Sequence, residues 1–255
     1  MDLSRVFLNS KYDGFMTLSD IHGELSPLLS AVKYARKHNL LIVTLGDLID
    51  GHGGWPFECV ELVLSLLDTG EGVAVIGNHC DKHYRRALGN PIKMGKEVMD
   101  TLHDVGTNRL AKFDDMLKRY ITHTNSDYYA YFGNVIMCHG GVMPEMWDYP
   151  TFIGKELRSR CIYGETDGTR ESNGLYKRTY QWSKAVPRGC IAVIGHDRVA
   201  KNKPAKKPAI YTNKSGGKVI FSDTGCGKEL NFPLTGCVFS VKKEKPRFVK
   251  FKQFT

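Results

Sequence analysis

The sequence predicts an α/β fold, because residues 1–90 contain three consecutive units in which a strand, a loop and a helix follow one another. In each unit a short apolar run ends in polar and glycine-rich residues, and apolar residues then recur at helical spacing. Such units form a mainly parallel sheet whose functional loops gather at the carboxyl ends of the strands. After Asp127 the strand patterns become short and frequent, so we expect a second, more antiparallel sheet joined by hairpins.

The three units open with the predicted strands 15–18, 40–45 and 73–76. In the first unit, Ser26 and Pro27 are typical of the N-cap and first turn of a helix, and an amphipathic pattern extends from them to His38. In the second unit, the nearly continuous apolar strand predicts burial on both faces, and a helical pattern covers 57–67. The third strand repeats the design and ends in Gly77-Asn78-His79.

Residues 95–120 show a polar helical pattern and predict a small helical insertion. The strands expected after it cover 128–132, 135–138, 191–194, 209–212, 218–221 and 237–241. Neither an internal repeat nor a low-complexity linker divides the sequence. We therefore expect one domain that spans residues 1–255.

The composition is that of a chain with one large core, since 42% of the 255 residues are hydrophobic. The first residues lack the apolar run of a signal peptide, and no apolar stretch reaches the length of a transmembrane helix, so we expect a cytoplasmic protein without membrane association. The seven cysteines are scattered without a C-x-x-C pair, which indicates neither a zinc knuckle nor a disulfide framework. We expect most of them to be small core residues.

The formal net charge of +9 is concentrated late in the sequence, in the basic segments 201–208 and 242–247. Basic patches are one footprint of phosphate-rich partners, such as nucleic acids or nucleotides. The alternative is a solvated surface hairpin, because these segments lack interleaved aromatic residues. Charge alone leaves both interpretations open.

Polar residues that bind metals or transfer protons stand directly after the predicted strands. They are Asp20, His22, Asp47, Asp50, Asn78, His79, His139 and His196. Carboxylates, imidazoles and an amide oxygen together suit manganese, iron or zinc, whereas the absence of cysteine from the set argues against structural zinc. Each motif alone is typical of a turn, but five of them in this order predict a binuclear metal site.

These motifs resemble those of a known family. They are Ser19-Asp20-Ile21-His22-Gly23, Gly46-Asp47-Leu48-Ile49-Asp50, Gly77-Asn78-His79, His139-Gly140-Gly141 and Gly195-His196. Their order and spacing resemble the calcineurin-like metallophosphoesterases of the phosphoprotein-phosphatase type over nearly the whole chain. The segments 77–86, 89–91, 157–158, 162–168, 174–175 and 223–226, with Trp182, are most similar to two neighbouring branches. One is the phosphatase module of bacterial polynucleotide kinase-phosphatase, and the other is the related bis(5'-nucleosyl)-tetraphosphatase branch.

The resemblance implies an α/β/β/α sandwich of two mixed sheets, with the helical insertion at about 95–120. It also implies two divalent ions, manganese first, with iron, zinc or nickel as alternatives. In this family pattern Asp20 and His22 hold the first ion, and Asp47 bridges both ions. The second ion is completed by Asn78, His139 and His196.

The same resemblance implies a mechanism of phosphoester hydrolysis. A hydroxide that bridges the two ions attacks phosphorus in line, without a covalent enzyme intermediate. His79 acts as the general acid that protonates the leaving oxygen. Asp50 accepts the other ring N–H of His79 and fixes its tautomer and orientation.

The sequence departs from the family pattern after Asp50. The family normally has an arginine there that binds the substrate phosphate, whereas this chain has Gly51-His52-Gly53-Gly54. Imidazole lacks the bidentate fork of a guanidinium group, so a substitute contact has to come from elsewhere. The candidates for this contact are His52, Arg85, Arg86 and Arg158. The usual glutamate after the catalytic histidine is Cys80 here.

The implied function is a phosphatase that acts on nucleotide or nucleic-acid phosphates. The candidate substrates are 3'-phosphate or 2',3'-cyclic phosphate ends of RNA, and dinucleoside polyphosphates. One alternative is a protein serine/threonine phosphatase of the bacteriophage kind, which shares the five motifs but should lack the segment 163–168. A second alternative is a nucleic-acid-binding module whose catalysis is weakened by the loss of the arginine.

Overall fold

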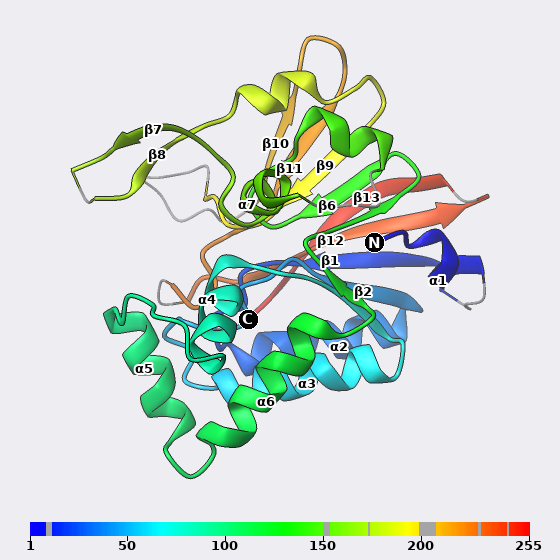
Figure 1. Ribbon diagram of the computed structural model, residues 1–255. Helices are drawn as coiled ribbons and strands as arrows, with labels where there is room; N and C mark the ends of the chain where they lie inside the picture. Colours follow the sequence, from blue (N-terminus) through cyan, green and yellow to red (C-terminus); the bar gives the residue numbers. More distant parts are fainter. Residues whose placement is uncertain (9–11, 150–153, 173, 199–207, 229–230, 244) are drawn as a thin grey trace.

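Two β-sheets pack face to face, and helices cover the outer face of each sheet (Figure 1). The structure is a computed structural model that describes all residues of 1–255 except 9–11, 150–153, 173, 199–207, 229–230 and 244. The predicted α/β/β/α arrangement of two mixed sheets is confirmed.

The first sheet has six strands in the order β13-β12-β1-β2-β3-β4. Its strands are β1 (Gly14–Leu18), β2 (Leu40–Thr44), β3 (Gly72–Val75), β4 (Ser126–Asp127), β12 (Leu234–Lys242) and β13 (Lys245–Phe254). The strands β1, β2, β3 and β4 run parallel, as the three sequence units predict. The strand β12 pairs antiparallel with β1, and β13 pairs antiparallel with β12.

The placement of residues 237–241 in the second sheet was wrong, because they belong to β12 of the first sheet. Phe239 lies in the core between the two sheets, where its ring stacks on that of Phe15 at a centroid distance of 4.6 Å. Its neighbour Val238 points to the opposite face and packs in the core under the helices. Both faces of β12 are therefore buried, which places it inside a covered sheet.

The second sheet has five strands in the order β10-β11-β9-β6-β5. Its strands are β5 (Tyr129–Phe132), β6 (Val135–Cys138), β9 (Ile191–Ile194), β10 (Ala209–Thr212) and β11 (Lys218–Phe221). This sheet is less antiparallel than expected, because β6, β9 and β11 run parallel and only the outer strands are antiparallel. The reason is a long connection from β6 to β9, which crosses over the sheet instead of forming a hairpin.

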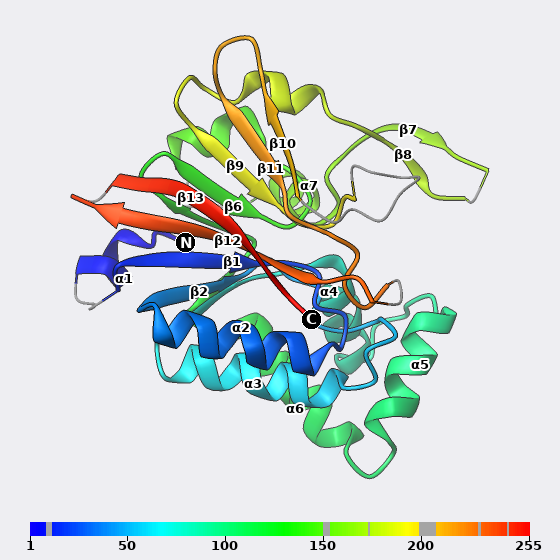
Figure 2. The ribbon, with the colours of Figure 1, turned by 180° about the vertical axis from the view of Figure 1, so that it is seen from behind.

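Helices cover the sheets on both sides. They are α1 (Ser4–Leu8), α2 (Leu25–Lys37), α3 (Pro56–Asp68), α4 (Asn78–Ala87), α5 (Lys96–Val105), α6 (Leu110–Thr122) and α7 (Lys155–Tyr163), with short 3₁₀ helices η1 (Pro144–Asp148) and η2 (Gln181–Ala185). A two-stranded hairpin of β7 (Glu165–Arg170) and β8 (Tyr176–Thr179) projects from the second sheet (Figure 1). The predicted insertion at 95–120 corresponds to α5 and α6. Seen from behind, α2 and α3 lie side by side under the first sheet (Figure 2).

One helix boundary differs from the prediction. The helix α2 begins at Leu25 with Glu24 as its N-cap, so Ser26 lies inside the first turn instead of capping it. The reason is that proline is tolerated at any position of the first turn, because the N–H that it lacks would have no helical acceptor there. Pro27 therefore does not determine the residue at which the helix begins.

The apolar side chains form three cores, one in each interlayer space. The first lies between the six-stranded sheet and helices α2, α3 and α6, the second between the two sheets, and the third on the outer face of the five-stranded sheet. Cysteines contribute to all of them, and six of the seven are buried, with only Cys190 partly exposed. The prediction that most cysteines are small core residues is thereby confirmed.

The basic segments have separate outcomes. Most of 201–208 lies outside the described residues, and so does residue 244, while Lys242, Lys243 and 245–247 lie at the tip of the β12–β13 hairpin. With Ile191 and Lys218 at the amino ends of their strands, this tip lines a cavity of about 940 Å³. The cavity therefore lies at the edge opposite the predicted metal ligands. In the described part of the chain, no helix is long and apolar enough to span a membrane.

We expect Phe239→Ala to lower the free energy of unfolding by roughly 3–5 kcal/mol, because it opens a cavity in the core between the two sheets. Urea unfolding followed by circular dichroism measures this change. The control is Val249→Ala on β13, whose side chain is 52% exposed and whose loss should cost less than about 1 kcal/mol. Equal costs for the two variants would contradict this account of how β12 joins the layers.

Candidate metal centre

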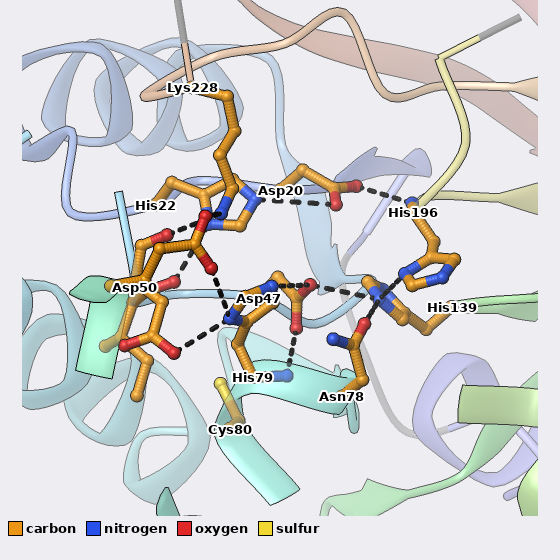
Figure 3. A network of polar contacts seen from close by, with 12 residues as sticks. Asp20, His22, Asp47, Asp50, Asn78, His79, Cys80, His139, His196 and Lys228 are labelled. Carbon is orange, nitrogen blue, oxygen red and sulfur yellow. Dashed lines mark hydrogen bonds and ion pairs between the residues drawn. The ribbon is translucent and has the colours of Figure 1, made fainter. Parts of the chain in front are cut away.

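The predicted site residues lie together at the carboxyl ends of strands from both sheets (Figure 3). Asp20 and His22 follow β1, and Asp47 and Asp50 follow β2. Asn78 and His79 begin α4 just after β3, while His139 follows β6 and His196 follows β9. The centre is therefore built where the two sheets meet, from segments that are up to 176 residues apart in the sequence.

Two groups of possible metal ligands share one carboxylate. One group is Asp20, His22 and Asp47, and the other is Asp47, His139 and His196, with the ligand atoms of each group within 4.8 Å of one another. The amide Oδ1 of Asn78 adds to the second group, because it lies 2.8 Å from Nε2 of His139. The geometry thus places Asp47 between two ligand sets.

The hydrogen bonds of the histidines favour a cation at these positions. Nδ1 of His139 donates to the carbonyl of Leu45 at 2.7 Å, which directs Nε2 into the centre. There Nε2 faces two oxygens, Oδ2 of Asp47 at 3.1 Å and Oδ1 of Asn78 at 2.8 Å. A single proton on Nε2 serves only one of these acceptors well, whereas a divalent cation attracts all three atoms.

His22 is held in the same way. Its Nδ1 donates to the carbonyl of Ile49 at 2.8 Å, so that Nε2 faces Oδ1 of Asp20 at 3.8 Å. An outer hydrogen bond that fixes the ring of a ligating histidine is a common feature of metal sites. The donor chemistry of both groups therefore fits divalent metal ions.

The backbone at the centre is strained in a way that ordinary turns are not. Five of the predicted residues have a positive φ, between 49° and 65°: Asp20, His22, Asp47, Asp50 and His196. This left-handed region is costly for residues other than glycine and persists only where the surroundings impose it. Such strain is concentrated at functional sites, which supports a common role for these loops.

Close backbone approach explains two of the glycines beside the ligands. A Cβ on Gly77 would lie 2.3 Å from Oδ1 of Asp47, and a Cβ on Gly46 would lie 2.5 Å from Cα of Gly77. That carboxylate oxygen accepts the backbone N–H of His79 at 2.9 Å. Any larger residue at position 77 would therefore displace the shared carboxylate.

His79 and Asp50 form a pair next to the two ligand groups. Nδ1 of His79 donates to Oδ2 of Asp50 at 2.8 Å, and its Nε2 lies 3.9 Å from Oδ2 of Asp47. The second ring nitrogen of His79 therefore points to the space beside the shared carboxylate. This is the position that a proton donor to a bound phosphate ester needs.

Two residues that the sequence analysis did not single out support this pair. His83 is fully buried on α4, and its Nε2 lies 2.7 Å from Oδ1 of Asp50. The hydroxyl of Thr101 on α5 donates to the same oxygen at 2.8 Å. The spacing of four residues between His79 and His83 puts both on one face of a helix, and this was the available signal.

The buried charges shift the titration of the centre. Burial by itself raises the pKa of Asp47, but the imidazoles of His139 and His79 outweigh burial and hold that pKa well below its usual range. For Asp50, burial is likewise outweighed by its hydrogen bonds from His79 and His83, which lower the pKa. Both carboxylates are therefore ionised at neutral pH.

The imidazoles respond in the opposite sense. Burial lowers the pKa of His79, yet the carboxylates of Asp47 and Asp50 outweigh it, so the net shift is upward. Burial also lowers the pKa of His139, but the carboxylates of Asp47 and Asp20 outweigh it and raise the pKa to about 9. Burial raises the pKa of the Cys80 thiol, which makes a nucleophilic role unfavourable.

The residues predicted to bind the substrate phosphate are placed less favourably. The side chain of His52 is exposed. Arg85 and Arg158 both pair with Asp81, at 3.0 and 2.7 Å. Arg86 pairs with Asp114 on α6.

Two other cations reach the centre, and the sequence analysis missed both. Arg178 on β8 contacts Nε2 of His196, and its Nε lies 3.1 Å from Oδ1 of Asp197. Lys228 comes from the loop before β12, and Figure 3 shows its side chain extending toward Asp50. Neither position follows a predicted strand, so the pattern used to find the ligands did not include them.

Comparison with known proteins indicates the same family that the sequence motifs resemble. Residues 15–222 match the family described as calcineurin-like phosphoesterase. Curated relatives from Anoxybacillus flavithermus and Bacillus subtilis, both named asymmetrical bis(5'-nucleosyl)-tetraphosphatase PrpE, are each 26% identical over 82% of this chain and 84% of the relative. A solved structure of a protein suggested to be a diadenosine tetraphosphatase is 20% identical, has a TM-score of 0.54, and is matched over 94% of this chain and 95% of that one. This structural likeness shows the fold alone.

We expect the affinity for Mn²⁺ to fall as the pH falls from about 9 to about 6. A metal ion needs the neutral imidazole of His139, whose raised pKa of about 9 means that the ion must displace a proton below that pH. Because of this one group, the affinity for Mn²⁺ should fall by up to ~10-fold for each unit by which the pH falls. Calorimetric titration with Mn²⁺ across this range measures it, and His139→Asn should give a shallower slope. An affinity independent of pH would contradict the assignment.

Proposed function

The chain belongs to the calcineurin-like phosphoesterase family, and from this premise we propose that it hydrolyses nucleotide phosphates at a binuclear metal centre, with dinucleoside polyphosphates as substrates. The family and the tetraphosphatase relatives make it a metal-dependent hydrolase of phosphoester bonds. The proposal concerns the substrate, the two-metal arrangement and the role of each residue.

The observation that carries the proposal is the position of Asp47 in both groups of possible ligands. A carboxylate that belongs to both ligand groups would serve as the bridging ligand that a two-metal centre requires. Asp20 and His22 would complete the first position. Asn78, His139 and His196 would complete the second.

When bound, a pair of divalent ions polarises phosphoryl oxygens and lowers the pKa of water to near neutrality. Manganese suits the oxygen and nitrogen donors, and iron, zinc and nickel are alternatives. The protein itself fixes the ligands, because Leu45 and Ile49 accept the outer N–H groups of His139 and His22. It also excludes water around Asp47, which is 1% exposed.

His79 would protonate the leaving oxygen. Its raised pKa keeps the imidazole protonated in a larger fraction of molecules at neutral pH. Asp50 accepts the N–H at Nδ1, so the transferable proton is at Nε2, on the side of Asp47. Thr101 and His83 hold Asp50 in turn.

Arg178 would contact the substrate phosphate at the opposite end of the centre. Its guanidinium group already lies against His196, beside the second ligand group. An arginine there is charged throughout the physiological pH range and can bind two phosphate oxygens at once. This contact stands in addition to the arginines predicted from the sequence.

The choice of dinucleoside polyphosphates rests on the two curated relatives, which are named tetraphosphatases and align over most of this chain. The segment 163–168, which a bacteriophage-type protein phosphatase should lack, is present and extends from the last residue of α7 into β7. All the possible metal ligands are also in place, which argues against a module with weakened catalysis. The nucleotide hydrolase is therefore the function that we propose.

A substrate panel tests this function. We expect hydrolysis of a bis(5'-nucleosyl) tetraphosphate to a nucleoside triphosphate and a monophosphate, with loss of activity in chelator and recovery with manganese. RNA ends with a 3'-phosphate or 2',3'-cyclic phosphate and a phosphoserine peptide are the competing substrates, and Asp47→Asn is the inactive control. Faster turnover of the peptide would overturn the nucleotide assignment, and full activity in the metal-free protein would overturn the mechanism.

The role of His79 is tested by the leaving group. We expect His79→Gln to slow hydrolysis of an alkyl phosphate ester by ~10² to 10⁴, and to affect an activated aryl ester much less, because only the alkoxide needs protonation. Steady-state kinetics on both esters measure the difference. The matched control is His103→Gln, whose side chain is 90% exposed. Equal losses on the two esters would argue that His79 has another role.

A further inference from the structure

We propose that Lys228 is the phosphate-binding residue that replaces the missing arginine beside Asp50. This inference rests on the proposed function, since it names a substrate contact at the same centre. Three observations support it: position 51 has no room for a side chain, the loop that fills this space carries Lys228, and its ammonium group lies beside His79 and Asp50.

The first observation concerns Gly51. A Cβ at this position would lie 2.4 Å from both Cβ and the carbonyl oxygen of His22, and 2.7 Å from the carbonyl oxygen of Gly227. Real Cβ atoms do not come so close to backbone atoms. With this loop arrangement, an arginine at position 51 would displace either a predicted metal ligand or the loop that contains Gly227.

The second observation concerns that loop. Gly227 has a φ of +65°, and a Cβ there would lie 2.6 Å from Cβ of His22, so the loop is packed against the ligand as closely as Gly51 is. The backbone N–H of His52 donates to the carbonyl of Gly227 at 2.7 Å. His52 therefore contributes through its backbone, by anchoring the residue before Lys228.

The third observation concerns the ammonium group itself. Nζ of Lys228 donates to the carbonyl of Asp50 at 2.7 Å and to Oε1 of Glu97 at 2.7 Å. The carbonyl belongs to the residue immediately before the glycine that replaces the arginine. The other carboxylate oxygen of Glu97 lies 3.9 Å from Nδ1 of His79, which places this ion pair next to the proton donor.

The contacts of Lys228 leave it able to bind a ligand. An ammonium group has three N–H donors, and the contacts with Asp50 and Glu97 use two of them. The lysine side chain is only 19% exposed, whereas that of Glu97 is 54% exposed. Such a half-exposed ion pair is weak, so a phosphate group can take the place of Glu97 as the partner of Lys228.

The use of lysine in place of arginine also indicates a chemical class of substrate. An ammonium group is a compact point charge, whereas a guanidinium group binds two oxygens in a fork. One non-bridging oxygen is enough for lysine, so the contact suits a phosphate inside a diester or polyphosphate chain as well as a terminal one. Glu97 at the start of α5 would then act as the competing counter-ion that the substrate displaces.

The experiment measures binding of inorganic phosphate to the full-length, manganese-loaded protein by calorimetry, with metal occupancy checked for every variant. We expect Lys228→Gln to weaken phosphate binding about 10- to 100-fold, the usual effect of losing a hydrogen bond to a charged group. Lys228→Arg should keep most of the affinity. Glu97→Gln should tighten binding, and this gain should vanish in the double variant with Lys228→Gln.

The matched control is Lys96→Gln on the same helix as Glu97, because Lys96 is 83% exposed and pairs with Asp100. Phosphate affinity of Lys228→Gln within about twofold of the parent, or equal to that of the control, would overturn the proposal. An unchanged phosphate affinity in Glu97→Gln would contradict the inference that phosphate displaces Glu97 from Lys228. If phosphate binding depends on Lys228 but the protein cleaves no nucleotide, the proposed substrate is wrong and the phosphate contact of Lys228 still stands.

Discussion

The centre depends on one constraint, which is that the carboxylate of Asp47 is buried and ionised and must be surrounded by compensating groups. Burying a charge is costly unless hydrogen bonds or opposite charges offset the loss of water. The backbone N–H of His79 and the imidazole of His139 supply part of this compensation, at 2.9 and 3.1 Å. Together with Asp47 itself, these groups come from the ends of three strands, β2, β3 and β6. The parallel pairing of β2 with β3 and the facing position of β6 are therefore needed to compensate this carboxylate.

A second buried carboxylate organises the groups around the first. Asp50 receives hydrogen bonds from His79 and His83 on α4 and from Thr101 on α5. The helical insertion thus does more than cover the first sheet, because it fixes the orientation of the imidazole next to the ligands. This arrangement separates two functions on one loop: Asp47 faces the possible metal positions, and Asp50 faces the supporting helices.

The departure from the family pattern after Asp50 is compensated by tertiary structure. Removing the side chain at position 51 lets the loop before β12 pack onto His22, and that loop brings Lys228 to the same place. At the other end of the centre, the hairpin of β7 and β8 brings Arg178 against His196. Cations that a single motif would supply are therefore contributed by two distant segments, one beside each group of ligands.

The sequence by itself determined what is local. Apolar runs defined β1, β2 and β3, and the polar residues after them predicted which side chains gather, because the carboxyl ends of parallel strands meet at one edge. Only the tertiary structure decided the sheet to which β12 belongs, since its apolar pattern fits either core and the stacking of Phe239 on Phe15 selects one. It also decided which cations reach the centre. Lys228 and Arg178 have no periodicity or motif that marks them, and their positions follow from the paths of loops that are fixed by contacts between distant residues.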